Sequence, residues 1–494
     1  MIAAIEPILD ARIGYTLLAL FGIAWVGLGI WLGRHATTYE GYAVAGRNVG
    51  LAMGTATAVA TWITSNTTML APQLALQLGV WGMLAYSTAS FGLFAFAPMA
   101  TRIRQLMPAG YTAVEFIRRR YGRPGGIPFF LVSVFYALTW LISMAMAGGK
   151  LLEVLSGIPY ETGLTVVMTV CVLYTLFGGM YAVIGTDFIQ SVIIVIGLVV
   201  VALAVLTRVE FGEVHSTLTR ERPELLNVLF PAALMAIFNN MLFGFGEIFH
   251  SNVWWSRALA IRESIGGRAF LLGGVIWLPI PILAGFLGLA APALGIGISQ
   301  PDAVGPLVAA HVLGGIGAVV VFIIVFCSLA SSIDSLLAAT GDLLAHDVIL
   351  PTLRRVGHHP LDATKRAAAG GSVVALGLIA WGVAMLNKSD LASVLFFSGP
   401  LVASCIWPIL GGLYFRRPGP WAAAAAIVLG SGIGLAAYFT IGWFVASLVG
   451  AAVSGIVFAT LTILAPIRFD FRSLSELDDS PGWTDPATAG ESDR

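Results

Sequence analysis

The chain has 494 residues, of which 58% are hydrophobic and 11% are charged, and its formal net charge at pH 7 is zero. Charged residues make up about a quarter of ordinary soluble proteins, so this composition excludes an ordinary soluble protein. The balanced charge gives no indication of a nucleic acid or an acidic macromolecule as a partner.

Thirteen apolar segments follow one another along the chain. A helix needs about 20 predominantly apolar residues to cross a bilayer. Segments of this kind occupy residues 12–33, 50–78, 81–103, 127–155, 162–184, 187–207, 229–253, 269–295, 313–350, 368–387, 391–415, 420–439 and 441–465. We therefore expect an all-α polytopic membrane protein with about 13 transmembrane helices. Residues 1–466 would form the transmembrane domain. Residues 467–494 are rich in acidic residues, Ser, Gly and Pro, and would form a disordered cytoplasmic tail.

The basic residues predict the orientation of these helices. If the N-terminus lies outside, 20 of the 26 Lys and Arg residues fall in loops on the inside, five fall outside, and Lys150 lies within a span. Cytoplasmic loops carry such an excess of basic residues, so the C-terminus is expected in the cytoplasm. In one of these loops, TAVEFIRRRYG (112–122) is expected as a short surface helix. The composition, rich in Ala and Gly, indicates a multi-pass protein of the cell membrane, in a bacterial inner membrane.

Polar residues predict a break in two of the spans. The stretch ATAVATWITSNTTMLAPQ (56–73) interrupts the second span, and FNNMLFGFGEIFHSN (238–252) interrupts the seventh. Each of these spans stands first in a block of five. Transporters built from inverted repeats carry unwound helices at corresponding positions of their two halves, and their binding sites lie there. The positions predict a 5+5 inverted repeat, with residues 50–207 as the first repeat and residues 229–415 as the second.

The ninth span carries a polar face. Its four serines recur at i, i+3, i+4 and i+7, so they lie on one side of a helix; they are Ser328, Ser331, Ser332 and Ser335. Sodium is a hard cation that accepts hydroxyl, carbonyl and carboxylate oxygens as ligands. Together with carbonyls freed at the break of the second span, these hydroxyls predict a sodium site. The alternative is close packing of helices through small residues.

Two carboxylates on the same segment favour the functional interpretation. Asp334 lies at the edge of the serine face, and Asp342 lies close to the same stripe. A carboxylate inside the bilayer costs at least roughly 2.5 kcal/mol and marks a functional site by default.

The segment LFGGMYAVIGTDFIQSVIIVIG (176–197) resembles the signature of the sodium:solute symporter family, whose members carry proline, sugars, sialic acid and similar solutes. Three further stretches resemble motifs of this family and occur in its order: AGRNVG (45–50), WWSRALAIRES (254–264) and SSIDS (331–335). The resemblance covers about the first eleven spans. It implies the LeuT-like inverted-repeat fold, with one extra leading helix and two trailing helices.

The resemblance also implies one sodium site and, as in some members, a second cation site. The main site would consist of the carbonyls of Ala60, Ile63 and Ser328 and of the hydroxyls of Ser331 and Ser332. The second would consist of the carboxylate of Asp187 together with Ser331, Asp334 and Ser335. Because Asp334 stands where a serine is usual, we hypothesise a more anionic second site that holds sodium or a proton. The alternative is that Asp334 pairs with a basic or amide group as structural support.

The solute pocket is expected between the second, third, fourth, seventh and eleventh spans. Its candidate residues are Trp62, Thr67, Tyr136, Trp140, Asn239, Asn240, Glu247 and Ser398. Trp62 stands where proline carriers have an aspartate, and Thr67 where sugar carriers have a glutamine, so neither solute is favoured. For the aromatic residues the alternative is packing within the membrane. Glu247 would bind an amine, form a hydrogen bond in a gate, or cap a broken helix. A Gly-Pro break within 396–408 is expected to shape the outer lid.

These expectations describe a secondary active transporter. Inward sodium flow would drive symport of a small polar organic solute into the cell by alternating access. A proton-coupled symporter of the same fold and a transporter-like solute sensor are the alternatives. The chain contains neither HExxH nor Gly-x-Ser-x-Gly, so no enzyme is expected. No cofactor is expected, and sodium would be the co-transported ion. The protein would be surrounded by the lipid bilayer, and no obligate protein partner is expected. Amino acids, monocarboxylates and other small osmolytes all remain open as solutes.

Overall fold

The computed structural model describes residues 9–227, 229, 231–297, 301–386 and 391–475. Within these ranges the chain forms helices and no extended strand. The helices of the first half are α1 (Ala11–Gly33), α2 (Tyr39–Val44), α3 (Leu51–Trp62), α4 (Ser65–Ser87), α5 (Phe91–Leu106), α6 (Ala113–Ser156), α7 (Tyr160–Leu206), α8 (Phe211–Glu221), α9 (Pro231–His250) and α10 (Asn252–Ala260). Those of the second half are α11 (Gly266–Trp277), α12 (Pro279–Ala290), α13 (Val304–Leu344), α14 (Leu350–Arg355), α15 (Asp362–Ala384), α16 (Leu391–Phe397), α17 (Gly399–Ser404), α18 (Ile406–Tyr414), α19 (Pro420–Thr440) and α20 (Trp443–Leu464).

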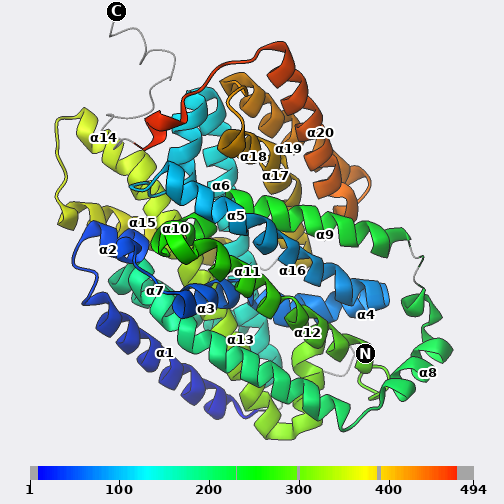
Figure 1. Ribbon diagram of the computed structural model, residues 1–494. Helices are drawn as coiled ribbons and strands as arrows, with labels where there is room; N and C mark the ends of the chain where they lie inside the picture. The colour runs from blue at the N-terminus through cyan, green and yellow to red at the C-terminus, as the bar shows by residue number, and fades with distance from the viewer. Residues whose placement is uncertain (1–8, 228, 230, 298–300, 387–390, 476–494) are drawn as a thin grey trace, which may run out of the picture.

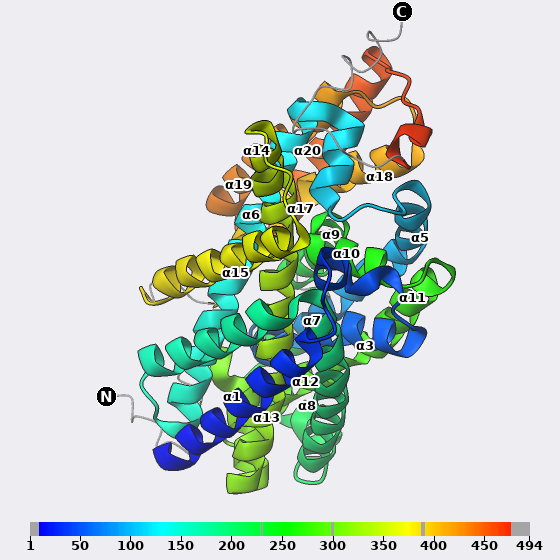
Figure 2. The same cartoon turned by 90° about the vertical axis from the view of Figure 1, so that its left-hand side faces the viewer.

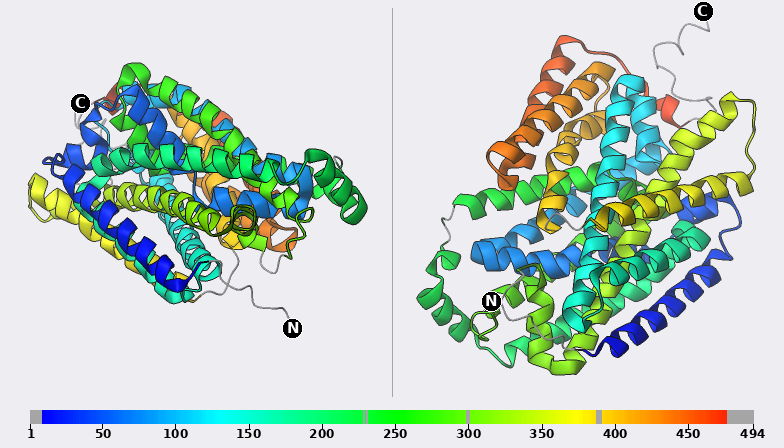
Figure 3. Two further views of the ribbon diagram at one scale, coloured as in Figure 1. Left: turned by 90° about the horizontal axis from the view of Figure 1, so that it is seen from below. Right: turned by 180° about the vertical axis from the view of Figure 1, so that it is seen from behind.

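Helix α13 runs through the middle of the bundle, and α3, α4, α6, α7 and α15 pack against it. Helix α1 lies on one flank, against α7, while α19 and α20 form the opposite flank (Figures 1 and 3). Figure 2 faces the flank formed by α1, α2 and α15. The serine face of α13 is therefore surrounded by protein and turned away from lipid.

Ten stretches of the described residues are long and apolar enough to cross a membrane. The chain is thus a polytopic α-helical protein, as its composition predicts. The second and seventh expected spans are each divided into shorter helices, and the fifth and sixth together form α7, which is kinked at Gly179. The count of thirteen spans and the 5+5 repeat stay predictions.

Glycines with positive φ break the longest helices. Gly79, Gly122, Gly179 and Gly314 have φ values of 70°, 61°, 54° and 65°, with ψ between −148° and −160°. This region of backbone space is open to glycine and strained for other residues. A Cβ at Gly179 would also lie 2.6 Å from the carbonyl oxygen of Tyr42. The boundary expected between residues 184 and 187 was therefore wrong, because the chain breaks where a glycine allows it.

The break predicted in the second span is confirmed. Helix α3 ends at Trp62, and Ile63 has a non-helical ψ of 80°. Thr64 then caps α4, because its hydroxyl accepts from Thr67 N and the Thr67 hydroxyl accepts from Thr64 N, each at 3.2 Å. The polar residues that interrupt the apolar pattern thus supply hydroxyl acceptors for the free backbone N–H groups at the start of α4.

The break predicted in the seventh span falls at the end of its stretch 238–252. Helix α9 continues through Gly244 and Gly246 to His250, and the chain leaves helical geometry only at Ser251, with ψ of 130°. A Cβ at Gly246 would lie 2.5 Å from the carbonyl carbon of Val402. Gly246 therefore allows α17 to pack closely on α9, Gly244 allows the backbone of Ala89 to approach it, and neither glycine unwinds the helix. The Gly-Pro break expected within 396–408 is present, since α16, α17 and α18 are separate helices.

Two segments expected in solvent pack on the bundle instead. The start of α6 was expected as a surface helix, but Arg120 is buried and donates to the carbonyls of Pro418 and Phe415 at 3.1 and 3.0 Å. The apolar side of this helix explains the burial, and two carbonyl groups of the connection between α18 and α19 accept hydrogen bonds from the Arg120 guanidinium. Leu474, within the expected tail, is also buried. The rest of that tail, residues 476–494, lies outside the described residues.

Candidate ion and solute site

The serine face of α13 meets the broken end of α3. The hydroxyl of Ser331 donates to the carbonyl of Ala60 at 2.9 Å, and that of Ser332 donates to the carbonyl of Thr61 at 3.1 Å. Both hydroxyls also reach the carbonyl of Ser328, at 3.3 and 3.0 Å. The structure thus brings together the two elements from which the sodium site was predicted. Neutral hydroxyl and carbonyl oxygens converge here out of contact with solvent.

Each serine uses a different group in this contact. The side chain of Ser328 turns back to the carbonyl of Ile324 at 2.8 Å, so its carbonyl is the group that faces Ser331 and Ser332. Ile63 lies at the break, where its ψ turns its carbonyl away from the helix axis of α3. Of the groups predicted as ligands, the carbonyls of Ala60 and Ser328 and the hydroxyls of Ser331 and Ser332 therefore lie at one junction between α3 and α13.

A buried guanidinium lies beside the predicted second cation site. Arg257 Nη2 donates to Asp187 Oδ2 at 3.0 Å and to the Ser335 hydroxyl at 2.6 Å. Its Nε donates to the Thr57 hydroxyl at 2.9 Å, and that hydroxyl donates to Asp187 Oδ2 at 2.5 Å. The side chains of Arg257 and Asp187 are both fully buried. In this arrangement a protein cation, and not a free ion, neutralises Asp187.

Sequence reasoning missed this role of Arg257, which was counted as a loop charge that sets orientation. The signal was present, because Arg257 belongs to the stretch WWSRALAIRES and directly follows a break in an apolar segment. A basic residue inside a bundle needs a carboxylate partner. Asp187, in the most specific motif of the sequence, was the candidate for it.

Asp334 lies next to this pair and is also buried. Its Oδ1 accepts from the Ser335 hydroxyl at 3.2 Å, and its Oδ2 from the Thr186 hydroxyl at 3.5 Å. In the part of the chain that the structure describes, its hydrogen bonds thus come from hydroxyl groups, while the guanidinium bonds to Asp187. The region holds two carboxylates and one guanidinium, so it has one acidic group more than it has cations.

A small cavity adjoins the predicted sodium site. Its volume is about 10 Å³, and Thr61, Tyr136, Trp140, Glu247, Trp254 and Ser332 line it. This is about the space that one water molecule needs. Thr61 and Ser332 also belong to the junction of α3 and α13, so the cavity and the predicted sodium site share a wall.

Glu247 is the acidic group of this cavity. Its side chain is buried, and its Oε2 accepts no hydrogen bond from a described residue. Aromatic rings surround it: Trp62 lies edge-on to Trp254 at 5.3 Å between ring centroids. Tyr136 packs edge-on against His250 at 4.6 Å. A carboxylate oxygen without a partner, in a cavity with aromatic walls, is arranged to accept a hydrogen bond from a bound molecule.

The remaining solute candidates do not line this cavity. Trp62 stacks on Trp277 at 4.8 Å and lies beside the cavity. Thr67 donates to the carbonyl of Trp62 and caps α4. Asn239 accepts from Ser447 N at 2.9 Å and joins α9 to α20, while Asn240 is buried away from the cavity. Ser398 donates to the carbonyl of Leu395 at the break between α16 and α17.

Comparison with known proteins identifies the architecture. The sodium:solute symporter family matches residues 42–430, which is well over half of the chain. The chain belongs to the sodium:solute symporter family. It is therefore a solute symporter of the membrane, and its relatives are transporters, not enzymes.

This symporter resembles relatives with different solutes. It is 25% identical to the urea-proton symporter DUR3 of Oryza sativa subsp. japonica, over 96% of this chain and 74% of the rice protein. It is 24% identical to the osmoregulated proline transporter OpuE of Bacillus subtilis (strain 168), over 84% of this chain and 86% of that protein. A solved sodium-coupled sialic acid symporter, in a substrate-bound outward-open state, has a TM-score of 0.78 at 17% identity and covers 92% of this chain and 99% of its own. That likeness shows the LeuT-like fold.

The buried ion pair of this symporter predicts a large, non-additive effect on stability. Replacing one partner leaves the other charge buried and alone, which costs about 3–5 kcal/mol, whereas replacing both costs much less. Arg257→Met and Asp187→Asn are each expected to lower the free energy of unfolding, measured by denaturant titration in detergent micelles, by an amount in this range.

The double variant decides between a pair and two independent residues. Arg257→Met with Asp187→Asn is expected to be more stable than either single variant. Arg262→Met, which replaces an exposed arginine of the same segment, serves as the control and should leave stability nearly unchanged. Additive losses in the double variant would contradict the pairing.

Proposed function

We propose that this symporter couples sodium inflow to the uptake of a small, neutral solute with N–H donors, of the urea type. The observation that carries the proposal is the shared wall of the cavity and the ion site at Thr61 and Ser332. The ion would bind among the oxygens at the junction of α3 and α13. The solute would bind on the other side of the same residues.

The chemistry of the junction supports sodium. Hydroxyl and carbonyl oxygens form a nearly neutral set of hard ligands, which suits a monovalent cation that must bind and leave in each cycle. Ala60 and Thr61 come from α3, and Ser328, Ser331 and Ser332 come from α13. An ion held by both helices favours the arrangement in which they lie together, and this is a coupling free energy between ion and conformation.

The chemistry of the cavity supports the solute class. A carboxylate accepts two parallel N–H donors from one edge of a planar group, as it does from a guanidinium. Flat aromatic walls such as Trp254 suit a planar solute. An anionic group on the solute would be repelled by Glu247. The described cavity holds about one water molecule, so side chains must move even for a solute as small as urea.

The relatives give independent support. The rice relative is a urea-proton symporter, and a urea active transporter of Saccharomyces cerevisiae is 23% identical over 87% of this chain and 63% of its own length. Proline carriers are also among the relatives. The unpaired oxygen of Glu247 favours the urea type over a solute that presents a carboxylate.

Proton coupling is the second candidate. The rice relative is named as proton-coupled, and Asp334 supplies a buried carboxyl that, among the described residues, accepts hydrogen bonds from the hydroxyls of Ser335 and Thr186. A proton on Asp334 would remove the excess negative charge beside Asp187. This candidate needs no change in the fold or in the solute cavity.

The first prediction concerns the sodium ligands. Ser332→Ala removes a hydroxyl that faces the junction, so the apparent sodium affinity of urea uptake in proteoliposomes is expected to weaken by about tenfold. Ser328→Ala is the matched control. Its hydroxyl is bonded within α13 and its carbonyl is retained, so it should leave the sodium dependence unchanged. Uptake that ignores a sodium gradient in the wild type would refute sodium coupling.

The second prediction concerns the solute carboxylate. Glu247→Gln keeps the shape of the side chain but removes its charge, and a hydrogen bond to a charged group contributes about 1.5–3 kcal/mol. The KM for urea is therefore expected to rise by about 10- to 150-fold, while Glu153→Gln, an exposed residue of α6, should not change it. A thermal-shift screen of the wild type with urea, acetamide, proline and acetate, with and without sodium, tests the class directly. Stabilisation by acetate or proline, without stabilisation by urea or acetamide, would contradict the proposed solute class.

The third prediction concerns Asp334. If this carboxyl carries a coupled proton, Asp334→Ser is expected to abolish the uptake driven by a pH gradient and to retain that driven by sodium. Uptake is measured in liposomes with either gradient imposed alone. Asp362→Ser, an exposed carboxylate at the start of α15, is the control. An unchanged response to both gradients, with the same Hill slope for sodium, would exclude a coupling role for Asp334.

A further inference from the structure

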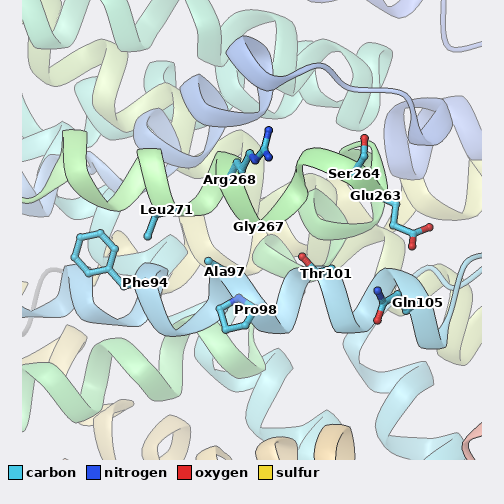
Figure 4. A pocket seen from close by; sticks show the side chains of 10 residues that line it. All are labelled: Phe94, Ala97, Pro98, Thr101, Gln105, Glu263, Ser264, Gly267, Arg268 and Leu271. Carbon is cyan, nitrogen blue, oxygen red and sulfur yellow. The ribbon is translucent and has the colours of Figure 1, made fainter.

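A groove opens on the outer surface of the bundle between α5 and the start of α11 (Figure 4). Its volume is about 850 Å³, far larger than that of the solute cavity, and its lining includes Phe94, Thr101, Gln105, Glu263, Arg268 and Leu271. None of these residues belongs to the ion or solute site, and nothing in the transport cycle proposed above uses the groove.

The groove faces the surroundings of the membrane domain. Both of its walls belong to candidate spans, Thr67–Leu106 and Glu263–Ala290. Leu271 is 48% exposed, and Val275, one turn further along α11, is 57% exposed. Side chains of this kind are exposed to hydrocarbon in a bilayer. An acyl chain is therefore the molecule available to fill the apolar part of the groove.

The lining divides along the length of the groove. Phe94 and Leu271 lie at one end in Figure 4, and Glu263 and Gln105 lie at the other, with Arg268 on the rim between them. The polar end coincides with the ends of the helices, because α5 ends at Leu106 and α11 begins at Gly266. It therefore lies at the depth of the lipid headgroups, on the side predicted to be cytoplasmic.

A close approach of the two helices forms the floor of the groove. A Cβ at Gly267 would lie 2.9 Å from the carbonyl oxygen of Ala97 and from the Thr101 hydroxyl. The backbone of α11 thus rests on α5 at this point, and the hydroxyl of Thr101 is left at the floor. Ser264 adds a second hydroxyl at the same end.

The polar end carries one positive and one negative charge, on separate side chains. Glu263 and Arg268 are both exposed, and the side chain of neither forms an ion pair or a hydrogen bond with another described residue, while Arg104 of α5 attracts Glu263 electrostatically. In Figure 4 the guanidinium of Arg268 and the carboxylate of Glu263 point in different directions, on either side of Gly267. A ligand that carries both charges, joined by a short linker, would match both groups.

We propose that this groove binds a glycerophospholipid with an ethanolamine headgroup. Its phosphate would accept hydrogen bonds from Arg268 and from the hydroxyls of the floor, as guanidinium groups bind phosphate. Its ammonium would donate to Glu263, and one acyl chain would lie against Phe94 and Leu271. A choline headgroup has no N–H to donate to Glu263. A glycerol headgroup has no cationic group to pair with Glu263, so the Glu263 carboxylate would lie unpaired beside an anionic lipid.

Native mass spectrometry of the full chain in detergent tests this proposal. Phosphatidylethanolamine, phosphatidylcholine and phosphatidylglycerol with identical acyl chains are titrated separately. The wild type is expected to bind phosphatidylethanolamine about tenfold more tightly than the other two, since one charge-assisted hydrogen bond distinguishes them. Glu263→Gln is expected to remove this preference, and Arg268→Gln to weaken binding of all three lipids. Leu271→Gln, at the apolar end, should weaken all three without changing their order.

Exposed charges elsewhere provide matched controls. Glu161→Gln and Arg417→Gln should retain the preference of the wild type, and equal thermal unfolding midpoints verify that each variant keeps its fold. Equal binding of the three lipids by the wild type would overturn the proposal. So would a preference that survives Glu263→Gln. Tighter binding of phosphatidylglycerol than of phosphatidylethanolamine would show a general anionic lipid site in its place.

Discussion

The end of α3 inside the bundle is the constraint on which the rest of the structure depends. The backbone leaves helical geometry at Ile63, and hydrocarbon offers no donor to the carbonyls that lose their partners there. The hydroxyls of Ser331 and Ser332 satisfy the carbonyls of Ala60 and Thr61. The carbonyls thus hold α13 against α3. A cation bound at the junction, as proposed, would replace the hydroxyl donors as the partner of these carbonyls, so the carbonyls would keep a partner with and without the ion. Reversible binding would then be compatible with a buried site.

The two ends of the contact between α3 and α13 differ in strength. At one end, Arg257 joins Thr57 of α3, Asp187 of α7 and Ser335 of α13 through hydrogen bonds that involve formal charges. Separating a buried pair of this kind leaves uncompensated charges and is costly. At the other end, near the break, neutral hydroxyls face neutral carbonyls, and each such bond contributes only about 1 kcal/mol net. We infer that the charged end stays closed while the neutral end rearranges. The guanidinium would therefore act as the fixed end of a hinge whose free end holds the ion.

The sequence predicted the features of this arrangement that depend on residues close together along the chain. The helical class follows from the length and composition of the apolar segments, and the break before Thr64 follows from the run of polar residues there. The polar pattern does not predict the breaks at Gly179 and Ser251. Glycines occur where a helix kinks and also where two helices pack closely, so a glycine alone does not locate a break. Gly179 forms a corner beside α2, whereas Gly246 admits the backbone of α17 within a continuous helix. The partner of Asp187 was missed for a related reason: it lies 70 residues away, on a segment that was interpreted as a loop.

In the proposed cycle, coupling between ion and solute would follow from the residues that they share. Thr61 and Ser332 bond to each other across the junction and also line the cavity that contains Glu247. An ion that fixed these two residues would fix one wall of the cavity, so a solute that needs this wall would bind better with the ion present. By reciprocity the solute would then strengthen ion binding by the same factor. A proton on Asp334 would act through the same part of α13, since Ser335 bonds to both Asp334 and the carbonyl of Ser331. Sodium at the break and a proton at Asp334 would thus bias one conformational equilibrium from opposite ends of a single helical turn.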